Sequence, residues 1–163
     1  MLLFLPHFAK TVFQVGATGL GFMEAAIAAG MLAGALTAGR LSAGKKRFWV
    51  IWGAIAGTCA TFLLMGAFPI YALHLGLLAV TGALFGGMNV VVMAYFQTRV
   101  PAAEMGRFMG LLTSIVFGLM PVSNGVFGML AGVIDPLRLL MINGSAIGVI
   151  AFLLFLVPGL RDE

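Results

Sequence analysis

Charged side chains are scarce in this sequence: Asp, Glu, Lys and Arg together account for 9% of its 163 residues. A soluble domain carries about 25% charged residues, so this composition leaves no room for a second, water-soluble domain. Cysteine is nearly absent as well. The single Cys59 lies inside an apolar run, where we interpret it as a small hydrophobic residue that carries no information about disulfides or redox compartment.

The motifs of soluble enzymes are also missing. The sequence has no phosphate-binding loop, no Cys/His metal spacing, no nucleophile elbow and no catalytic Ser/His or Asp pair within its apolar segments. We therefore expect no enzymatic activity, no metal and no cofactor. The nine Lys and Arg outnumber the five Asp and Glu, but they form no basic face with interleaved aromatic residues, so we expect no nucleic-acid partner.

Apolar residues are abundant, at 62% of the chain with a mean hydropathy of +1.14. They form consecutive segments of at least 21 residues, and about 20 residues are enough for a helix to cross a bilayer. Lipid offers no hydrogen-bond partner to the backbone, so these segments must be helical. The expected fold is an all-α integral membrane bundle of five full transmembrane helices, at residues 17–41, 48–68, 70–96, 108–134 and 137–157.

The distribution of basic residues predicts the orientation. Only Lys10 and Arg138 fall in one set of connections, and the other seven Lys and Arg fall in the alternate set: Arg40, Lys45, Lys46, Arg47, Arg99, Arg107 and Arg161. Basic residues concentrate on the cytoplasmic side of a membrane protein. We therefore expect a multi-pass protein of the cell membrane with a cytoplasmic C-terminus and an external segment around Lys10.

Residues 1–14 remain as a short apolar segment before the first span. They lack the basic start of a signal peptide, and Pro6, His7 and Lys10 interrupt them well before a full crossing. We interpret them as the outer end of a sixth helix whose inner part is missing. The chain is then expected to be incomplete at its N-terminus, or to begin at an internal methionine, and to form a single transmembrane domain over residues 1–163.

Small residues recur at helical spacing in every predicted span. Each span contains one Gly-x-x-x-Gly pair: Gly30/Gly34, Gly53/Gly57, Gly82/Gly86, Gly128/Gly132 and Gly144/Gly148. Such pairs let helix backbones approach closely in lipid. A pair in each span predicts a closely packed bundle.

The fourth span carries a longer stripe that includes Pro121. Gly110, Ser114, Pro121, Asn124 and Gly128 fall within about 80° of one another on a helix, and Pro121 lies near the middle of the span. Proline removes a backbone hydrogen bond and favours a kink. This kink is either static and buried in the bundle, or a hinge at which the helix bends.

Glu24 is the only acidic residue within a predicted span. A carboxylate in a membrane helix is costly to insert and often functional. Since the Gly30/Gly34 stripe should meet a neighbouring helix, Glu24 should point elsewhere. It is a candidate for proton coupling or cation recognition, and the alternative is a carboxyl group that hydrogen-bonds a neighbour or reaches the outer water.

Amide side chains provide the other polar candidates. Asn89 and Gln97 share a face with Gly82 and Gly86 in the third span; we favour a helix-stapling role for Gln97 and leave Asn89 open between staple and cavity lining. Asn124, beside the Pro121 kink, is the better candidate for lining a cavity. His7 and His74 are interpreted as lone histidines near the outer boundary.

Segments 97–101 (QTRVP) and 104–110 (EMGRFMG) together resemble the loop between the tenth and eleventh helices of major facilitator superfamily transporters. Gln97, Pro101, Gly106 and Arg107 carry this cytoplasmic motif, and Asn89 fits it by spacing. Residues 118–121 (GLMP) resemble the eleventh helix of the same branch, and residues 17–21 and 39–41 resemble the eighth helix and its following loop. Residues 45–47 are similar to a basic family motif but lack its usual aspartate. The branch contains drug- and macrolide-efflux-like proteins and siderophore-exporter-like proteins.

The resemblance implies that the five spans are helices eight to twelve, that residues 1–14 end helix seven, and that helices eight, ten and eleven flank the cavity. It also aligns Glu24 with an acidic residue common in that branch. The implied activity is proton-coupled efflux of small amphipathic compounds by alternating access, with the lipid bilayer, a small-molecule substrate and the missing N-terminal half as partners. Two alternatives remain: a self-assembling half-transporter, in which a second copy replaces the missing half, and a non-transporting membrane scaffold.

Overall fold

The computed structural model describes residues 4–41 and 47–156. In these ranges the chain is helical with no strand, and the elements are α1 (Phe4–Thr11), α2 (Gly16–Leu41), α3 (Arg47–Ala67), α4 (Tyr71–Arg99), α5 (Ala102–Ala131) and α6 (Pro136–Leu156). All of them except α1 are long and apolar enough to cross a membrane. The predicted all-α membrane bundle with five spanning helices is confirmed. The basic residues Lys45, Lys46 and Arg161 lie outside the described residues.

Prolines, rather than charges, mark the connections on both sides of α4. The sequence predicts a helix over 70–96 and a loop up to residue 107, but α4 continues to Arg99 and α5 already begins at Ala102. Between them Val100 is extended and Pro101 occupies the N-cap of α5, as expected because proline disfavours a helical conformation in the residue before it. The basic residues at this connection are therefore helical and reach water through their long side chains.

The chain turns sharply between α1 and α2. Gln14 and Gly16 both adopt positive φ angles, of 53° and 64°, and the amide of Val15 donates to the carbonyl of Ala9 at 3.0 Å. Glycine tolerates this left-handed conformation without cost, whereas a residue with a β-carbon seldom adopts it. The turn places the short α1 beside the beginning of α2.

Helices α2 and α4 form the closest pair in the bundle. Glycines of α2 lie against the backbone of α4, and glycines of α4 lie against the backbone of α2: Gly30 meets Ala79, Gly34 meets Ala83, Gly82 meets Ile27 and Gly86 meets Met31. A β-carbon at any of these four glycines would overlap a carbonyl oxygen of the facing helix. Two of the Gly-x-x-x-Gly pairs therefore act as one reciprocal interface.

Helix α3 packs against α6 and, less extensively, against α4. The indole nitrogen of Trp52 donates to the carbonyl of Ala151 at 3.0 Å. A β-carbon at Gly148 would lie 2.9 Å from the Cys59 sulfur, and one at Gly144 would lie 3.1 Å from Cβ of Phe62. Small residues thus bring α3 and α6 together too, while Gly53 has open space beside it.

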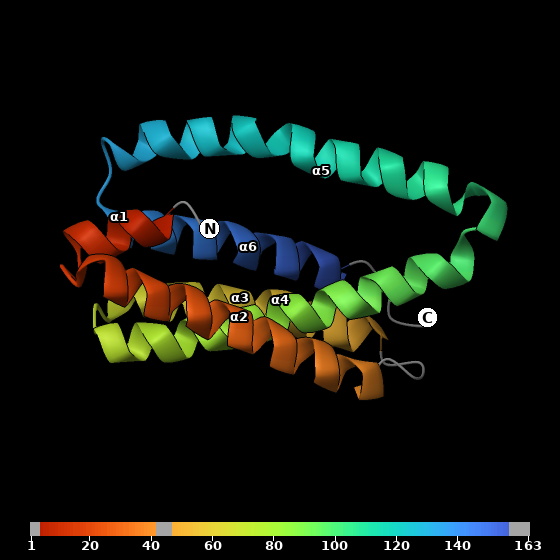
Figure 1. Ribbon diagram of the computed structural model, residues 1–163, viewed down its shortest axis with the longest axis horizontal. Coiled ribbons are helices and arrows are strands. Elements are labelled where there is room, and N and C mark those ends of the chain that lie inside the picture. Colours follow the sequence, from red (N-terminus) through yellow and green to blue (C-terminus); the bar gives the residue numbers. More distant parts are fainter. Residues whose placement is uncertain (1–3, 42–46, 157–163) are drawn as a thin grey trace.

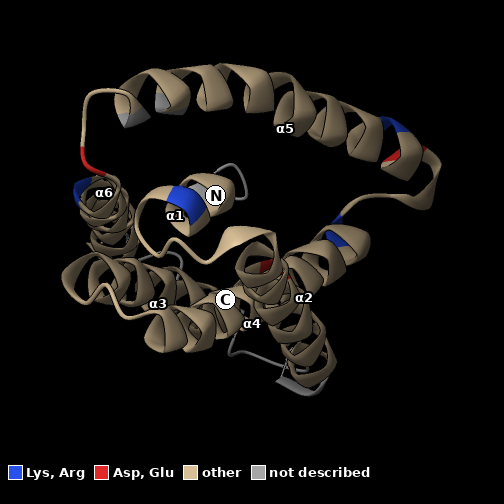
Figure 2. Ribbon diagram, turned by 60° about the vertical axis from the view of Figure 1, so that its left-hand side comes forward, with Lys and Arg blue, Asp and Glu red and all other residues tan. Residues whose placement is uncertain are grey.

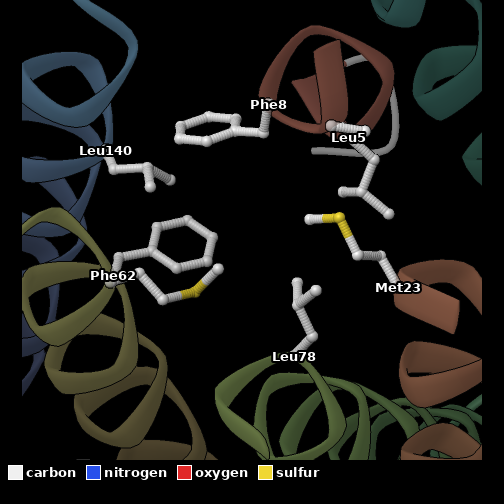
Figure 3. Close-up of a cluster of buried hydrophobic side chains, with 8 residues drawn as sticks. Leu5, Phe8, Met23, Phe62, Leu78 and Leu140 are labelled. Atoms are coloured by element: carbon white, nitrogen blue, oxygen red, sulfur yellow. The ribbon is translucent and has the colours of Figure 1, made fainter. Parts of the chain in front are cut away.

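A single apolar core joins α1, α2, α3, α4 and α6. Its buried side chains are Leu5, Phe8, Ala9, Met23, Phe62, Met65, Leu78 and Leu140. Figure 3 shows six of these side chains, from all five helices, pointing toward one another. Helix α5 contributes none of them.

Helix α5 lies apart from the other spans. It arches over the molecule, with α1 between it and the α2/α4 pair, in both views (Figures 1 and 2). Among its described residues, the membrane-spanning window of α5 contains no buried one, whereas each of the other spans buries 22% or more of its window. The predicted close packing therefore holds for the other spanning helices and not for α5.

Candidate functional site

Glu24 lies on the exposed side of α2, next to the buried Met23. A different face of α2 carries Gly30 and Gly34, which contact α4. Within the part of the chain that the structure describes, Glu24 has no hydrogen-bond or ion-pair partner. The helix pairing therefore leaves this carboxyl group free to face something outside the described bundle.

Asn89 and Gln97 are both exposed on α4. Neither side chain makes a hydrogen bond to another described residue, so the structure provides no support for the stapling role favoured for Gln97. The α2/α4 interface is held instead by backbone contacts at glycines. Asn89 is thereby available to a neighbour or a cavity outside the bundle.

The polar stripe of α5 is open over most of its length. Pro121 is exposed and Asn124 is half-exposed. At Gly110, Gly118 and Gly128, an added β-carbon would meet no atom within 4 Å. The helix continues through Pro121 from Ala102 to Ala131.

The candidate residues are therefore distributed over α2, α4 and α5 without direct contacts among them. No hydrogen bond or ion pair links Glu24, Asn89 and Asn124 within the described ranges. Two hollows lie elsewhere. One, of about 400 Å³, is lined by apolar residues of α3 and α6, and the other, of about 430 Å³, lies between α1 and the beginning of α2. None of the three candidate residues lines either hollow.

Gln97, Pro101, Gly106 and Arg107, the residues of the predicted cytoplasmic motif, are all exposed around the α4–α5 connection. Aromatic and cationic contacts stabilise this connection. The rings of Phe96 and Phe108 stack edge to face with centroids 5.0 Å apart, which ties the end of α4 to the first turns of α5.

The Arg99 guanidinium lies 5.5 Å from the centroid of the Tyr95 ring, one turn back on the same helix, in a cation–π contact. The motif residues lie on both sides of this connection, but the sequence does not indicate the aromatic pairing or the cation–π contact.

His74 is the polar residue whose burial the sequence interpretation missed. It was expected to be a lone histidine at the boundary, yet its side chain is 0% exposed, among the most buried in the chain. The Phe8 and Phe13 rings lie 6.4 Å and 4.7 Å from it. No local sequence signal indicates this burial, because the two phenylalanines come from elements earlier in the chain.

The chain is similar in sequence to exporters of enterobactin. An enterobactin exporter, EntS, of Shigella flexneri is 28% identical to the chain over 157 residues, which cover 96% of the chain and 38% of that protein. An enterobactin exporter of Escherichia coli O1:K1 / APEC is 28% identical over 144 residues, covering 88% of the chain and 35% of the exporter. No protein-family model and no solved structure matches the chain.

The chain is thus homologous to enterobactin exporters, and it spans less than two fifths of their length. The predicted resemblance to the siderophore-exporter branch of the major facilitator superfamily is confirmed. Since these relatives are transporters, the homology also agrees with the prediction that the chain is not an enzyme.

Proposed function

We propose that the chain is the C-terminal half of a facilitator-type secondary transporter that exports small amphipathic compounds by alternating access, coupled to protons. Homology over 96% of the chain to only 38% of an exporter supports the assignment to part of a transporter. In such proteins two helical halves rock against each other around a site near the middle of the membrane. On this proposal, α2 to α6 are helices eight to twelve, and α1 is the outer end of helix seven.

The observation that carries the proposal is the unpartnered α5. A membrane helix with Gly110, Gly118 and Gly128 open to approach, and Asn124 and Pro121 along the same stripe, is suited to close contact with another helix. A polar amide facing only lipid would be costly. A second helical half beside α5 would cover this stripe and form the other wall of a pathway.

The exposed polar groups of α2 and α4 are consistent with a position along the same transport pathway. Glu24 lies off the glycine-lined face of α2, and Asn89 is exposed although it shares a face of α4 with Gly82 and Gly86. A carboxyl group within the hydrocarbon region normally faces the bundle interior or a water-filled cavity. We therefore assign Glu24, Asn89 and Asn124 to the substrate and proton pathway, Glu24 to proton coupling, and Pro121 to the hinge.

The small number of polar side chains along the proposed pathway indicates the class of substrate. Few strongly polar side chains on largely apolar helices favour amphipathic organic molecules over sugars or inorganic ions, which require more hydrogen-bonding groups. The relatives are named as exporters of enterobactin, and we propose a compound of comparable chemistry for this chain.

The test compares the chain alone with the chain produced together with the polypeptide encoded directly upstream of it. Efflux of enterobactin and of a fluorescent amphipathic dye is measured in cells that lack their own exporters. We expect no efflux from the chain alone and efflux from the two together. Native mass measurement and cross-linking of the purified chain identify its partner.

If a homodimer of the chain carries out efflux, the self-assembling half-transporter is correct and this proposal is wrong. Absence of efflux in every combination would favour a scaffold. The open face of α5 is compatible with a second copy of the chain as well as with a missing half, so the oligomeric state separates these two assemblies.

A further inference from the structure

His74 occupies an enclosed position at the beginning of α4. Its Nδ1 atom lies 3.1 Å from the carbonyl oxygen of Ile70, one turn earlier. Its Nε2 atom is buried and makes no hydrogen bond. Buried polar atoms are nearly always paired, and an unpaired one normally has a structural or functional explanation.

A second backbone carbonyl, that of Met65 at the end of α3, also faces the imidazole. In a continuing helix this oxygen would accept a hydrogen bond from the residue four positions later. That residue is Pro69, which has no N–H. The N–H of Phe68 is already used, since it donates to Leu64 at 3.0 Å. The α3–α4 turn therefore supplies no backbone N–H for the Met65 carbonyl oxygen.

The remaining surroundings of the ring are aromatic and apolar. Phe8 of α1 and Phe13 of the α1–α2 connection contact it from one side. Met65 and Leu78, on α3 and α4, are buried in the adjoining core. Water is excluded from the ring by this packing, since His74 is 0% exposed.

No other ionisable group balances a charge at this position. The titratable or charged side chains on the packed elements include His7 and Lys10 of α1, Glu24 of α2, Cys59 of α3, Tyr71 of α4, and Arg138 of α6 with the adjoining Asp135. The others, Arg40, Arg47, Tyr95 and Arg99, belong to the opposite ends of α2, α3 and α4. Among the described contacts none of them bonds or stacks with His74. Lys10, Glu24, Asp135 and Arg138 are exposed, and the Tyr71 hydroxyl donates to the Gly19 carbonyl at 2.9 Å.

We propose that His74 is a proton-binding site whose charged form joins the end of α3 to the beginning of α4. A neutral imidazole has one N–H, and a protonated one has two. With Nδ1 donating to Ile70, the added proton on Nε2 gives the ring a donor for the Met65 carbonyl. Binding of one proton thereby pairs two buried groups that are otherwise unpaired, and hydrogen bonds from a charged donor are the stronger kind.

Protonation of His74 affects the aromatic packing around the ring as well as the hydrogen bond to Met65. Phe8 and Phe13 lie against the same ring that takes up the proton. A change in the ring therefore reaches α1 and the α1–α2 connection, where Gln14 already holds a positive φ of 53°. This site is separate from the pathway residues proposed above, and it does not depend on the chain being part of a transporter.

The experiment is a histidine titration of the whole chain in lipid nanodiscs by nuclear magnetic resonance. The chain contains two histidines, so His7→Gln leaves His74 as the only imidazole. Nitrogen-15 shifts of the ring report the proton directly, and the carbonyl carbon of Met65 is labelled as an independent reporter. We expect His74 to take up a proton reversibly and the Met65 carbonyl signal to change with the same midpoint.

Pro69→Ala supplies the missing N–H, so that residue 69 competes with His74 for the Met65 carbonyl. Loss of a hydrogen bond from a charged donor corresponds to a shift of about one pH unit or more in the midpoint, and we expect that shift toward acid. Pro136→Ala adds an N–H in the first turn of α6, where no carbonyl within the helix can accept it, so it is the matched control and should leave the midpoint in place.

Three results overturn the proposal: a ring that stays neutral from pH 4.5 to 8.5, a Met65 carbonyl signal that does not follow the ring, or equal midpoints in the two proline variants. The first two are measured on a chain with the native Pro69. The proposal therefore stays testable even if the Pro69→Ala variant fails to fold.

Discussion

The α-carbon of Gly30 on α2 lies against the backbone carbonyl of Ala79 on α4, so closely that a β-carbon at position 30 would overlap the carbonyl oxygen. Gly82 repeats the relationship in the opposite direction, with its own absent β-carbon directed at the Ile27 carbonyl. A clash with backbone cannot be relieved by rotating a side chain. The α2/α4 pair is therefore the part of the bundle least tolerant of added volume.

The first prediction concerns this pair. Gly34→Val places a branched side chain against the Ala83 backbone, and overpacking typically costs about 1–3 kcal/mol. We expect at least that loss in the free energy of unfolding, measured in bicelles. Gly128→Val introduces the same residue on α5, where an added β-carbon meets open space, and should cost much less. Equal losses would contradict the α2/α4 contact described here.

The second prediction concerns Tyr71, whose hydroxyl donates to the Gly19 carbonyl at 2.9 Å and whose ring lies 5.5 Å from that of Phe13. Tyr71→Phe keeps the ring contact and removes the hydrogen bond. The expected loss is about 0.5–1.5 kcal/mol of unfolding free energy. Tyr95→Phe is the control, because the Tyr95 hydroxyl bonds no other described residue. A stability change no larger than in this control would mean that the bond is not formed in the membrane.

The third prediction tests Glu24 as the coupling group of the assembled transporter. Glu24→Gln keeps the shape of the side chain and removes its charge, so substrate efflux should continue but no longer accelerate when the outside is acidified. Vesicles with an imposed pH gradient and a fluorescent substrate measure this dependence. Glu104→Gln, in the exposed first turn of α5, should retain it. Unchanged pH dependence in Glu24→Gln excludes the coupling role.

The fourth prediction tests Pro121 as a hinge. Pro121→Ala restores a backbone N–H in the middle of α5 and should stiffen the helix. We expect transport about tenfold slower, equivalent to a barrier about 1.4 kcal/mol higher, with substrate affinity retained. Spin labels near the two ends of α5 should report a narrower distance distribution. If replacing Pro121 changes neither the transport rate nor the distances, the proline produces only a static kink.

The fifth prediction concerns orientation. In a Cys59→Ala background, Gln14→Cys lies between α1 and α2 and Ala102→Cys lies at the start of α5, both at exposed positions. An impermeant maleimide added to whole cells should label position 14 and should reach position 102 only after the membrane is opened. The reverse pattern would invert the topology predicted from the basic residues.

The sequence predicts the helices well because each apolar run is long and lipid leaves the backbone few alternatives. It also identifies the glycines that bring helices together, since helical periodicity shows which residues share a face. It does not show which helix lies opposite. Gly30 and Gly82 could be matched only in three dimensions, and the glycines of α5 follow the same pattern with no neighbour at all.

His74 shows the same limit for the candidate site. Its position near a predicted boundary suggests exposure, but burial depends on Phe8 and Phe13, which arrive from elements far earlier in the chain. Glu24 was expected to point away from the α2 glycines, and its exposed position is consistent with that expectation. Whether it, Asn89 and Asn124 share one pathway remains a prediction, because any second wall lies outside this chain.

The short connections at the two ends of α5 have a mechanical consequence. Val100 and Pro101 join α5 to α4 at one end, and residues 132–135 join it to α6 at the other. Because α5 is joined to the rest of the bundle at its two ends, a bend at its centre changes the distance between those ends. A partner that bends the middle of α5 would therefore displace α4 and α6 together. The close backbone contacts between α4 and α2 would transmit the displacement to α2.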